Sequence, residues 1–280
     1  MLEIRFQYRW TNFERNIDGY HVTQTHTMTN GPNRIKAVEN VFEIVENVGK
    51  LDGCRVRELA DHMDLPKSTA HIYLKTLEDT GYVVRRNEKY QLSLRFLNVG
   101  GQVRHNNSLY QVGRNKVDDL ARTISEVATI GCEENGYRVM LYRTEPTGAI
   151  FNNASTGEYT RMHWTALGKA ILSQKSDGEI TEIADRHGLP RATEHTIVDR
   201  DALLDEIETI RLQGYAIEDE ERVKGVKSVA VQVESDGETP DAAISVAGPK
   251  HEFTPDRIQE ELLPALQNTA NVVELKTKHY

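Results

Sequence analysis

Two short amphipathic helices, separated by a proline, are predicted between Cys54 and Phe96, and they constrain the fold more than any other stretch of the chain. Three apolar residues share one face of the first helix, expected over residues 57–64: Leu59, Ala60 and Met63. Pro66 lacks a backbone N–H, so it ends this helix and suits the first turn of the next. The second helix, expected over residues 67–79, buries a stripe with helical spacing: Ala70, Leu74 and Leu77.

A two-stranded ribbon is predicted directly after these helices. Gly81 ends the second helix, and residues 82–86 and 89–94 are predicted as strands around the polar turn Asn87-Glu88. This order is the layout of a winged helix-turn-helix, whose second helix fits the major groove of DNA while basic residues of the wing meet phosphates. The candidate DNA contacts are outward-facing or basic residues: Arg57, Lys67, Ser68, Thr69, His71, Ile72, Lys75, Arg85, Arg86 and Lys89.

The alternative for this stretch is a small helical subdomain whose basic residues are merely solvated. We favour DNA binding because the helix spacing, the turn and the basic wing agree. The net charge of the whole chain is −9, which is unusual for a DNA-binding protein. Residues 31–98 carry 11 Lys+Arg against 10 Asp+Glu, whereas residues 99–280 carry 20 against 30. The acidic excess therefore lies outside the predicted DNA-binding segment, and it also fits a protein that stays soluble at high salt in a halophilic source.

Length and apolar content bound the class of protein. A chain of 280 residues predicts two domains. No apolar run approaches the ~20 residues needed to cross a bilayer, and we expect a cytoplasmic protein. Cys54 and Cys132 fall in different predicted domains, so neither a disulfide framework nor a metal knuckle is expected. No cofactor is expected.

The chain before the helix-turn-helix has two parts. Residues 1–30 have scattered aromatic residues without a sustained period, and they lack the continuous apolar core of a signal peptide. We expect a poorly structured extension, with translation starting at Met28; the alternative is a flexible arm that touches DNA or a partner. Residues 33–48 are predicted as an amphipathic helix that Gly49 ends. Its apolar face is wider than three small helices need, so part of it is expected to pair with a second subunit.

A family resemblance becomes clear at this point. The first half contains RIKAVENVFEIVE, VRELADHMDLPKSTAHIYLKTLEDTGYVVR and YQLSLRFLNVG, and the second half contains HWTALGKAIL, IRLQGYAIEDEE, GVKSVAVQV and AAISVAGP. These motifs, in this order over roughly residues 33–275, resemble the IclR family of bacterial and archaeal transcriptional regulators. The resemblance implies a winged helix-turn-helix over residues 31–97, a linker helix over residues 98–107 and a GAF-like effector-binding domain over residues 108–278. It also implies a homodimer or homotetramer on a palindromic operator of double-stranded DNA.

The second domain is predicted to be of the α+β class, with helices packed on a sheet. Strands are expected at residues 127–133, 137–143, 148–152, 215–218, 227–234 and 241–247, with turns at Asn135-Gly136 and Asp236-Gly237. Helices are expected at residues 108–126, 165–174, 177–186, 200–212 and 254–275, the last interrupted near Pro264. Gly100 and Gly101 are expected to be a flexible point in the linker.

Two of these strands pair a bulky face with a small-residue face. Val229, Val231 and Val233 share one side of their strand, and Ser228 and Ala230 share the other; Ser245 lies on the small side of the last strand. Space beside the small residues could hold a ligand, although small residues also permit close helix packing. The resemblance places effector binding here and at HWTALGKAIL, and the candidate residues are Met162, His163, Ala166, Leu167, Gly168, Glu218, Ser228 and Ser245.

The chemistry expected of this site is recognition of a small carboxylate. The first backbone N–H groups of the helix after Thr165 lack partners within the helix and suit an anion. We expect a hydroxy or keto acid, such as a sugar acid, and Glu218 could accept a hydrogen bond from its hydroxyl. Two departures from the family affect specificity: Ile72 stands where arginine is frequent and could touch a thymine methyl instead, and Ala247 replaces a second serine.

Other functions have weaker support in the sequence. The acidic run Glu218–Glu221 with His163 could suggest a metal or acid–base site, but such runs are usually solvated loops, and no ligand spacing supports it. His187 and His195 are expected at the surface. No serine–histidine–aspartate pattern or phosphate loop is present, so no catalytic or metal residue is predicted. The alternative to a regulator of catabolic genes is a metabolite sensor or enzyme-like protein that does not bind specific DNA.

Overall fold

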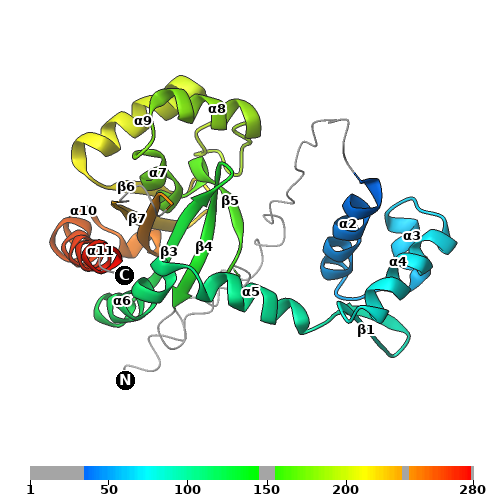
Figure 1. The fold of residues 1–280 in the computed structure, drawn as a ribbon. Coiled ribbons are helices and arrows are strands. Elements are labelled where there is room, and N and C mark those ends of the chain that lie inside the picture. Colours follow the sequence, from blue (N-terminus) through cyan, green and yellow to red (C-terminus); the bar gives the residue numbers. More distant parts are fainter. Residues whose placement is uncertain (1–34, 145–154, 235–239, 279–280) are drawn as a thin grey trace. The chain divides into compact units, whose positions relative to one another are not determined.

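A computed structural model of the chain describes residues 35–144, 155–234 and 240–278, which divide into two compact units (Figure 1). The described residues up to Arg104 form the smaller unit, and those from His105 onward form the larger. The division falls inside the predicted linker at 98–107. The predicted extension at 1–30, the strand at 148–152 and the turn at Asp236-Gly237 lie outside the described residues.

The smaller unit has the elements of a winged helix-turn-helix. They are α2 (Lys36–Lys50), α3 (Val56–His62), α4 (Lys67–Asp79), β1 (Val83–Arg86), β2 (Lys89–Leu92) and α5 (Arg95–His105). The predicted stripe of α4 is confirmed, because Ala70, Leu74 and Leu77 are all buried. Asn87 and Glu88 both have positive φ, as a tight hairpin turn requires, and they join the antiparallel strands at Arg86 and Lys89.

One prediction about a glycine in this unit is wrong. Helix α2 passes through Gly49; its end is closed by Gly53, which has a φ of 87° and donates its N–H to the carbonyl of Val48 at 3.0 Å. Gly100 and Gly101 lie inside α5, which is continuous through both, and a flexible point there stays a prediction. Arg95 ties the start of α5 to the end of α4, because it donates a hydrogen bond to the carbonyl of Thr80 at 2.7 Å.

The larger unit is built on a six-stranded antiparallel sheet in the order β5-β4-β3-β8-β7-β6. The strands are β3 (Val127–Glu134), β4 (Tyr137–Thr144), β5 (Tyr159–Arg161), β6 (Ala216–Asp219), β7 (Val226–Val233) and β8 (Ala242–Pro249). The helices are α6 (Ser108–Ile124), η1 (Met162–Trp164), α7 (Ala166–Leu172), α8 (Asp177–His187), α9 (Arg200–Gln213), η2 (Lys250–Glu252), α10 (Pro255–Arg257), η3 (Ile258–Leu262) and α11 (Leu263–Thr277).

The two faces of this sheet pack as the strand patterns predict. The bulky face lies under α6 and α11, where Val229, Val231 and Ile244 belong to the main hydrophobic core. The small-residue face lies under α7, with α8 and α9 packed outside it, and contributes Ala216, Ala230 and Ala243 to a second core (Figure 1). Small residues let the short helix α7 approach the strands closely. They also leave the part of the face beyond α7 lined by polar side chains.

The last helix is interrupted as predicted near Pro264. Residues 258–262 form a π-helical turn, and Pro264 lies in the first turn of α11, where its missing N–H leaves no helical bond unmade.

Candidate functional site

The outer face of α4 is the candidate DNA-binding surface. Five of the predicted residues are exposed there: Lys67, Ser68, His71, Ile72 and Lys75. Thr69 is half-buried and contributes less surface. The Ile72 side chain is apolar but 64% exposed, because it lies on the face of α4 opposite the buried stripe. An exposed isoleucine at this position offers a contact for a base-edge methyl group.

The basic residues around α4 differ in how far they are already paired. Lys75 forms ion pairs with Glu78 at 3.1 Å and Asp79 at 2.8 Å, and Arg57 pairs with Asp61 at 3.5 Å. The guanidinium of Arg85 lies 5.7 Å from the centre of the Tyr90 ring. Arg86 and Lys89 are exposed at the tip of the β1–β2 ribbon, without an ion pair to any described residue. These two are the cations best placed to meet phosphates.

Sheet register brings three of the predicted effector residues together. Glu218 on β6 pairs with Ser228 on β7, and Ser245 on β8 lies one pleat further along, opposite Ala230. Thr129 on β3 pairs with Ser245 and is only 7% exposed. Thr129 was not predicted from the sequence. It shares the small-residue side of β3 with Gly131, but only the register places it in this site.

Glu218 is a buried carboxyl held by three donors. The Ser228 hydroxyl donates to it at 2.8 Å, and the backbone N–H groups of Glu221 and Arg222 donate at 2.9 and 3.2 Å. Burial raises the pKa of Glu218 to about 7, and the charge of Glu221 adds to the rise, although the hydrogen bonds oppose it. The group can therefore gain or lose a proton near neutral pH.

The raised pKa of Glu218 predicts a pH dependence of stability. The folded pKa of about 7 lies above the ordinary glutamate value of 4.5, so the folded state binds the proton more tightly than the unfolded state does. The contribution to stability is complete below the unfolded pKa and is lost as pH rises through 7, up to about 3 kcal/mol in all. Urea unfolding at pH 5 and pH 8 should show Glu218→Gln losing less stability than wild type over this range. Glu182→Gln, on the outer surface of α8, should behave as wild type; equal pH slopes in all three proteins would contradict the prediction.

The start of α7 is occupied more fully than the sequence indicates. The Thr165 hydroxyl caps the helix by accepting the N–H of Gly168 at 3.0 Å, so this N–H has a partner. A Cβ at Gly168 would lie 2.2 Å from the carbonyl oxygen of Met162, so the glycine is needed for packing against η1. Ala166 and Leu167 are buried with the rest of α7.

Met162 and His163 face a different region from Glu218. Both line a small pocket between η1 and α8, together with Arg161 and His187. The His163 ring donates to the Pro190 carbonyl at 3.2 Å, and burial lowers its pKa to about 4, so it is neutral. His187, expected at the surface, is half-buried. Its ring packs against Tyr137, with centroids 4.3 Å apart.

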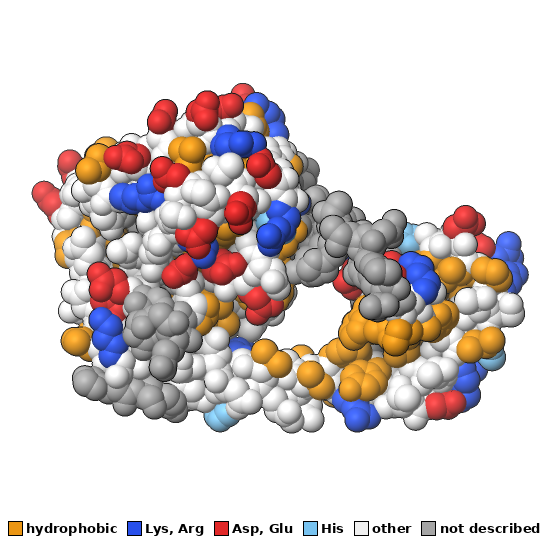
Figure 2. Space-filling view, turned by 45° about the horizontal axis from the view of Figure 1, so that its top comes forward, with side chains coloured by type: hydrophobic (Ala, Val, Ile, Leu, Met, Phe, Trp, Pro, Cys, Tyr) orange, Lys and Arg blue, Asp and Glu red, His pale blue; other side chains and the backbone are white. Residues whose placement is uncertain are grey.

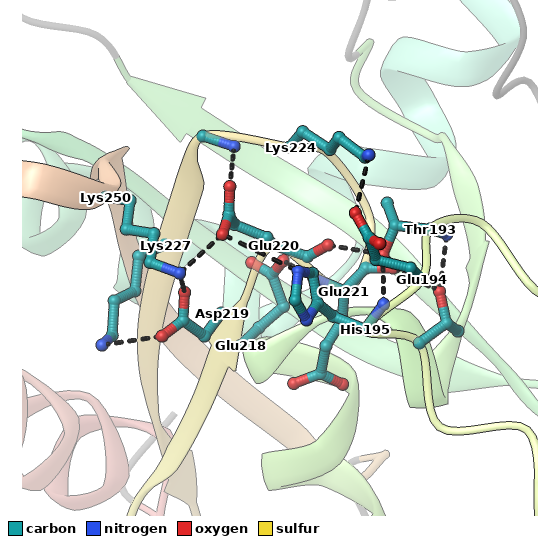
Figure 3. Close-up of polar contacts among 12 residues, drawn as sticks. Thr193, Glu194, His195, Glu218, Asp219, Glu220, Glu221, Lys224, Lys227 and Lys250 are labelled. Atoms are coloured by element: carbon teal, nitrogen blue, oxygen red, sulfur yellow. Dashed lines mark hydrogen bonds and ion pairs between the residues drawn. The ribbon is translucent and has the colours of Figure 1, made fainter.

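A solvated loop was expected for the acidic run Glu218–Glu221, but its side chains instead contact other residues of the fold (Figure 3). Asp219 pairs with Lys227 at 3.1 Å and Lys250 at 2.8 Å, and Glu220 also pairs with Lys250. Glu218 and Glu221 are buried, and each accepts a hydrogen bond within the fold, Glu218 from Ser228 and Glu221 from Lys169. His195 lies 4.0 Å from Glu220. No group of metal-binding side chains occurs within residues 35–144, 155–234 and 240–278.

Comparison with known proteins identifies the family to which this chain belongs. Residues 37–87 match the IclR helix-turn-helix domain, and residues 101–275 match the bacterial transcriptional regulator IclR C-terminal domain. The chain is 29% identical over 254 residues to the probable HTH-type transcriptional regulator ArcR of Halobacterium salinarum, covering 88% of this chain and 95% of that one.

Solved structures agree with this assignment. The IclR structure of Thermotoga maritima superposes with a TM-score of 0.72 at 24% identity, over 87% of this chain and 99% of that one. An IclR homologue of Microbacterium hydrocarbonoxydans, complexed with 4-hydroxybenzoate, has the same TM-score at 21% identity, over 87% and 98%. A helix-turn-helix unit joined to an effector-type α+β unit defines a ligand-responsive transcriptional regulator. The chain belongs to the IclR family of these regulators. No helix in the part of the chain that the structure describes is long and apolar enough to span a membrane.

Proposed function

We propose that this protein is a cytoplasmic homodimer or homotetramer that binds a palindromic operator and controls catabolic genes in response to a small organic acid. The observation that carries the DNA-binding part is the exposed outer face of α4, together with Arg86 and Lys89, which are exposed at the ribbon tip and form no ion pair with a described residue. A helix of this kind supplies base contacts, and the ribbon supplies phosphate contacts that fix its register.

An apolar surface on the smaller unit supports assembly with a second copy. Several large apolar side chains of α2 and α5, and of the residues next to them, are exposed: Ile35, Val38, Phe42, Leu94, Leu97 and Val103. Figure 2 shows hydrophobic side chains gathered over this unit. Apolar patches of this kind mark interfaces, and a two-fold dimer would present two α4 helices to the two halves of a palindrome.

The effector part of the proposal rests on the face that holds Glu218, Ser228, Ser245 and Thr129. Its hydroxyl groups suit a polar ligand, and one solved relative holds 4-hydroxybenzoate. Effector binding there would shift the equilibrium between conformations of the oligomer that differ in operator affinity.

Chromatin immunoprecipitation in the native host, with and without candidate carbon sources, tests the proposed function. We expect a few sharp peaks over palindromes beside catabolic genes, and occupancy that changes with one carbon source. Absence of peaks under every condition would favour the second candidate, a metabolite sensor without specific DNA binding.

The ribbon cations predict a defined salt effect on operator binding. In the double variant Arg86→Ala/Lys89→Ala, each lost phosphate contact should reduce the slope of log affinity against log salt by about 0.9. Fluorescence anisotropy between low and high salt measures this slope. Ile72→Ala is the matched control, because it removes an apolar base contact and should change sequence preference while leaving the slope intact. An unchanged slope in the double variant would place the ribbon away from DNA.

A further inference from the structure

A buried arginine with an unfilled donor among the described residues lies on the polar face of the effector unit. Arg138, on β4, is only 3% exposed and lies opposite Thr160 of β5. Its neighbour Val139 points into the core under α6, so Arg138 points to the other side, the side of Ser228 and Ser245. The Nε atom of Arg138 is fully buried without a hydrogen-bond partner among the described residues. Its ionic partner is Glu158, at 3.8 Å.

The carboxylate of Glu158 also binds a second arginine, Arg222, which comes from the opposite edge of the sheet. Arg222 follows β6 in the chain, and its guanidinium donates to Glu158 at 2.8 Å. The backbone N–H of Arg222 donates to Glu218 at 3.2 Å. These contacts form a continuous polar run from Glu218 through Arg222 and Glu158 to Arg138, which crosses the face from β6 to β5.

The hydrogen-bonding capacity of the two guanidinium groups is not filled in this run. Both groups share the carboxylate of Glu158, and the Nε of Arg222, like that of Arg138, is buried without a hydrogen bond to any described residue. Burial, together with the charge of Arg222, lowers the pKa of Arg138 to about 10, while Glu158 opposes this change. A buried cation with a distant partner is costly for the fold unless another anion completes its shell. Guanidinium groups bind carboxylates through paired, charge-assisted hydrogen bonds.

We propose that Arg138 is the anchor for the anionic group of the effector, which binds between Arg138 and Arg222 and accepts hydrogen bonds from their unfilled guanidinium donors. This inference rests on the effector role proposed above, and it assigns the carboxylate to a guanidinium rather than to the start of α7. The hydroxyl groups of Ser228, Ser245 and Thr129 remain available on the same face for the rest of the ligand. Effectors of this protein are therefore carboxylates, and their neutral amides are poor ligands.

Matched acid and amide pairs test the anchor in the full-length protein. The probes are pyruvate, lactate, gluconate and 4-hydroxybenzoate, each beside its neutral amide, and the readouts are thermal shift and calorimetry. At least one acid should bind wild type more tightly than its amide. Arg138→Met should weaken binding of that acid by about tenfold to a hundredfold, the loss of a charge-assisted hydrogen bond, and leave the amide unchanged. Arg138→Lys should recover part of the loss.

Two controls separate binding from folding. Arg138→Met leaves Glu158 paired with Arg222, so the ligand-free protein should unfold at the same temperature as wild type or higher. Arg200→Met removes an exposed arginine that pairs with Asp185 on the surface and should bind the acid as wild type does. A lower unfolding temperature of Arg138→Met, with acid and amide affected alike, would assign the arginine a structural role and overturn the anchor.

The remaining outcomes also decide the question. Equal binding of acid and amide, or full binding of the acid by Arg138→Met, overturns the anchor and leaves the effector proposal standing. Failure of every acid and amide to bind wild type overturns the effector proposal and the anchor with it, while DNA binding is judged separately by chromatin immunoprecipitation.

Discussion

Replacing Lys169 with methionine should lower the free energy of unfolding of the larger unit by about 3–5 kcal/mol near neutral pH. Lys169 on α7 is 1% exposed and donates to Glu221 at 2.7 Å and to Glu206 at 2.8 Å. Methionine fills a similar volume but leaves a buried carboxylate without its counter-charge. Burial raises the pKa of Glu221 even with the lysine present. The loss should therefore grow as pH rises, because the folded variant must either keep a proton or bury a charge.

Urea unfolding at pH 5 and pH 8 measures this effect. Lys224→Met is the matched control, since Lys224 and Glu194 form a solvent-exposed ion pair that adds little to stability. Adding Glu221→Gln to Lys169→Met should recover much of the stability by removing the uncompensated charge. A loss no larger than that of the control would mean that water enters the site and solvates Glu221.

If the proposed oligomer forms through α2, replacing Phe42 with aspartate should separate its subunits and reduce affinity for the proposed palindromic operator by about a hundredfold to ten-thousandfold. The Phe42 side chain is 64% exposed on α2, among other exposed apolar side chains. A charge there cannot be buried against a second subunit without a large desolvation cost. Two linked α4 helices bind two half-sites with high effective concentration, whereas a monomer binds one.

Analytical ultracentrifugation and operator titration together test this prediction. The operator is a palindrome found by chromatin immunoprecipitation, and the comparison is with its isolated half-site. Phe42→Asp should bind palindrome and half-site with similar affinity, while wild type strongly prefers the palindrome. Leu212→Asp is the control, because Leu212 on α9 is 82% exposed in the other unit. A Phe42→Asp protein that remains dimeric with full affinity would place the interface elsewhere.

The sequence by itself determined the local elements and the family. The stripe of Ala70, Leu74 and Leu77, the turn at Asn87-Glu88 and the alternation of bulky and small residues in β7 all arise from neighbours within one or two turns of chain. Periodicity and turn chemistry encode such features directly. The same locality explains the error at Gly49, since glycine is compatible with helix once packing supports it.

Only the tertiary structure decided which charged groups are buried together. Lys169 and Glu221 are separated by 52 residues, and Glu158 and Arg222 by 64. Their meeting depends on the strand order that places β6 and β5 at opposite edges of one sheet, with the chain after β6 reaching back to β5. No local pattern records that register, because each of these residues has the same sequence signal as a solvated surface charge. The pairing, and the unfilled donor of Arg138, exist because folding brings distant segments into one water-poor space where each charge must find a partner.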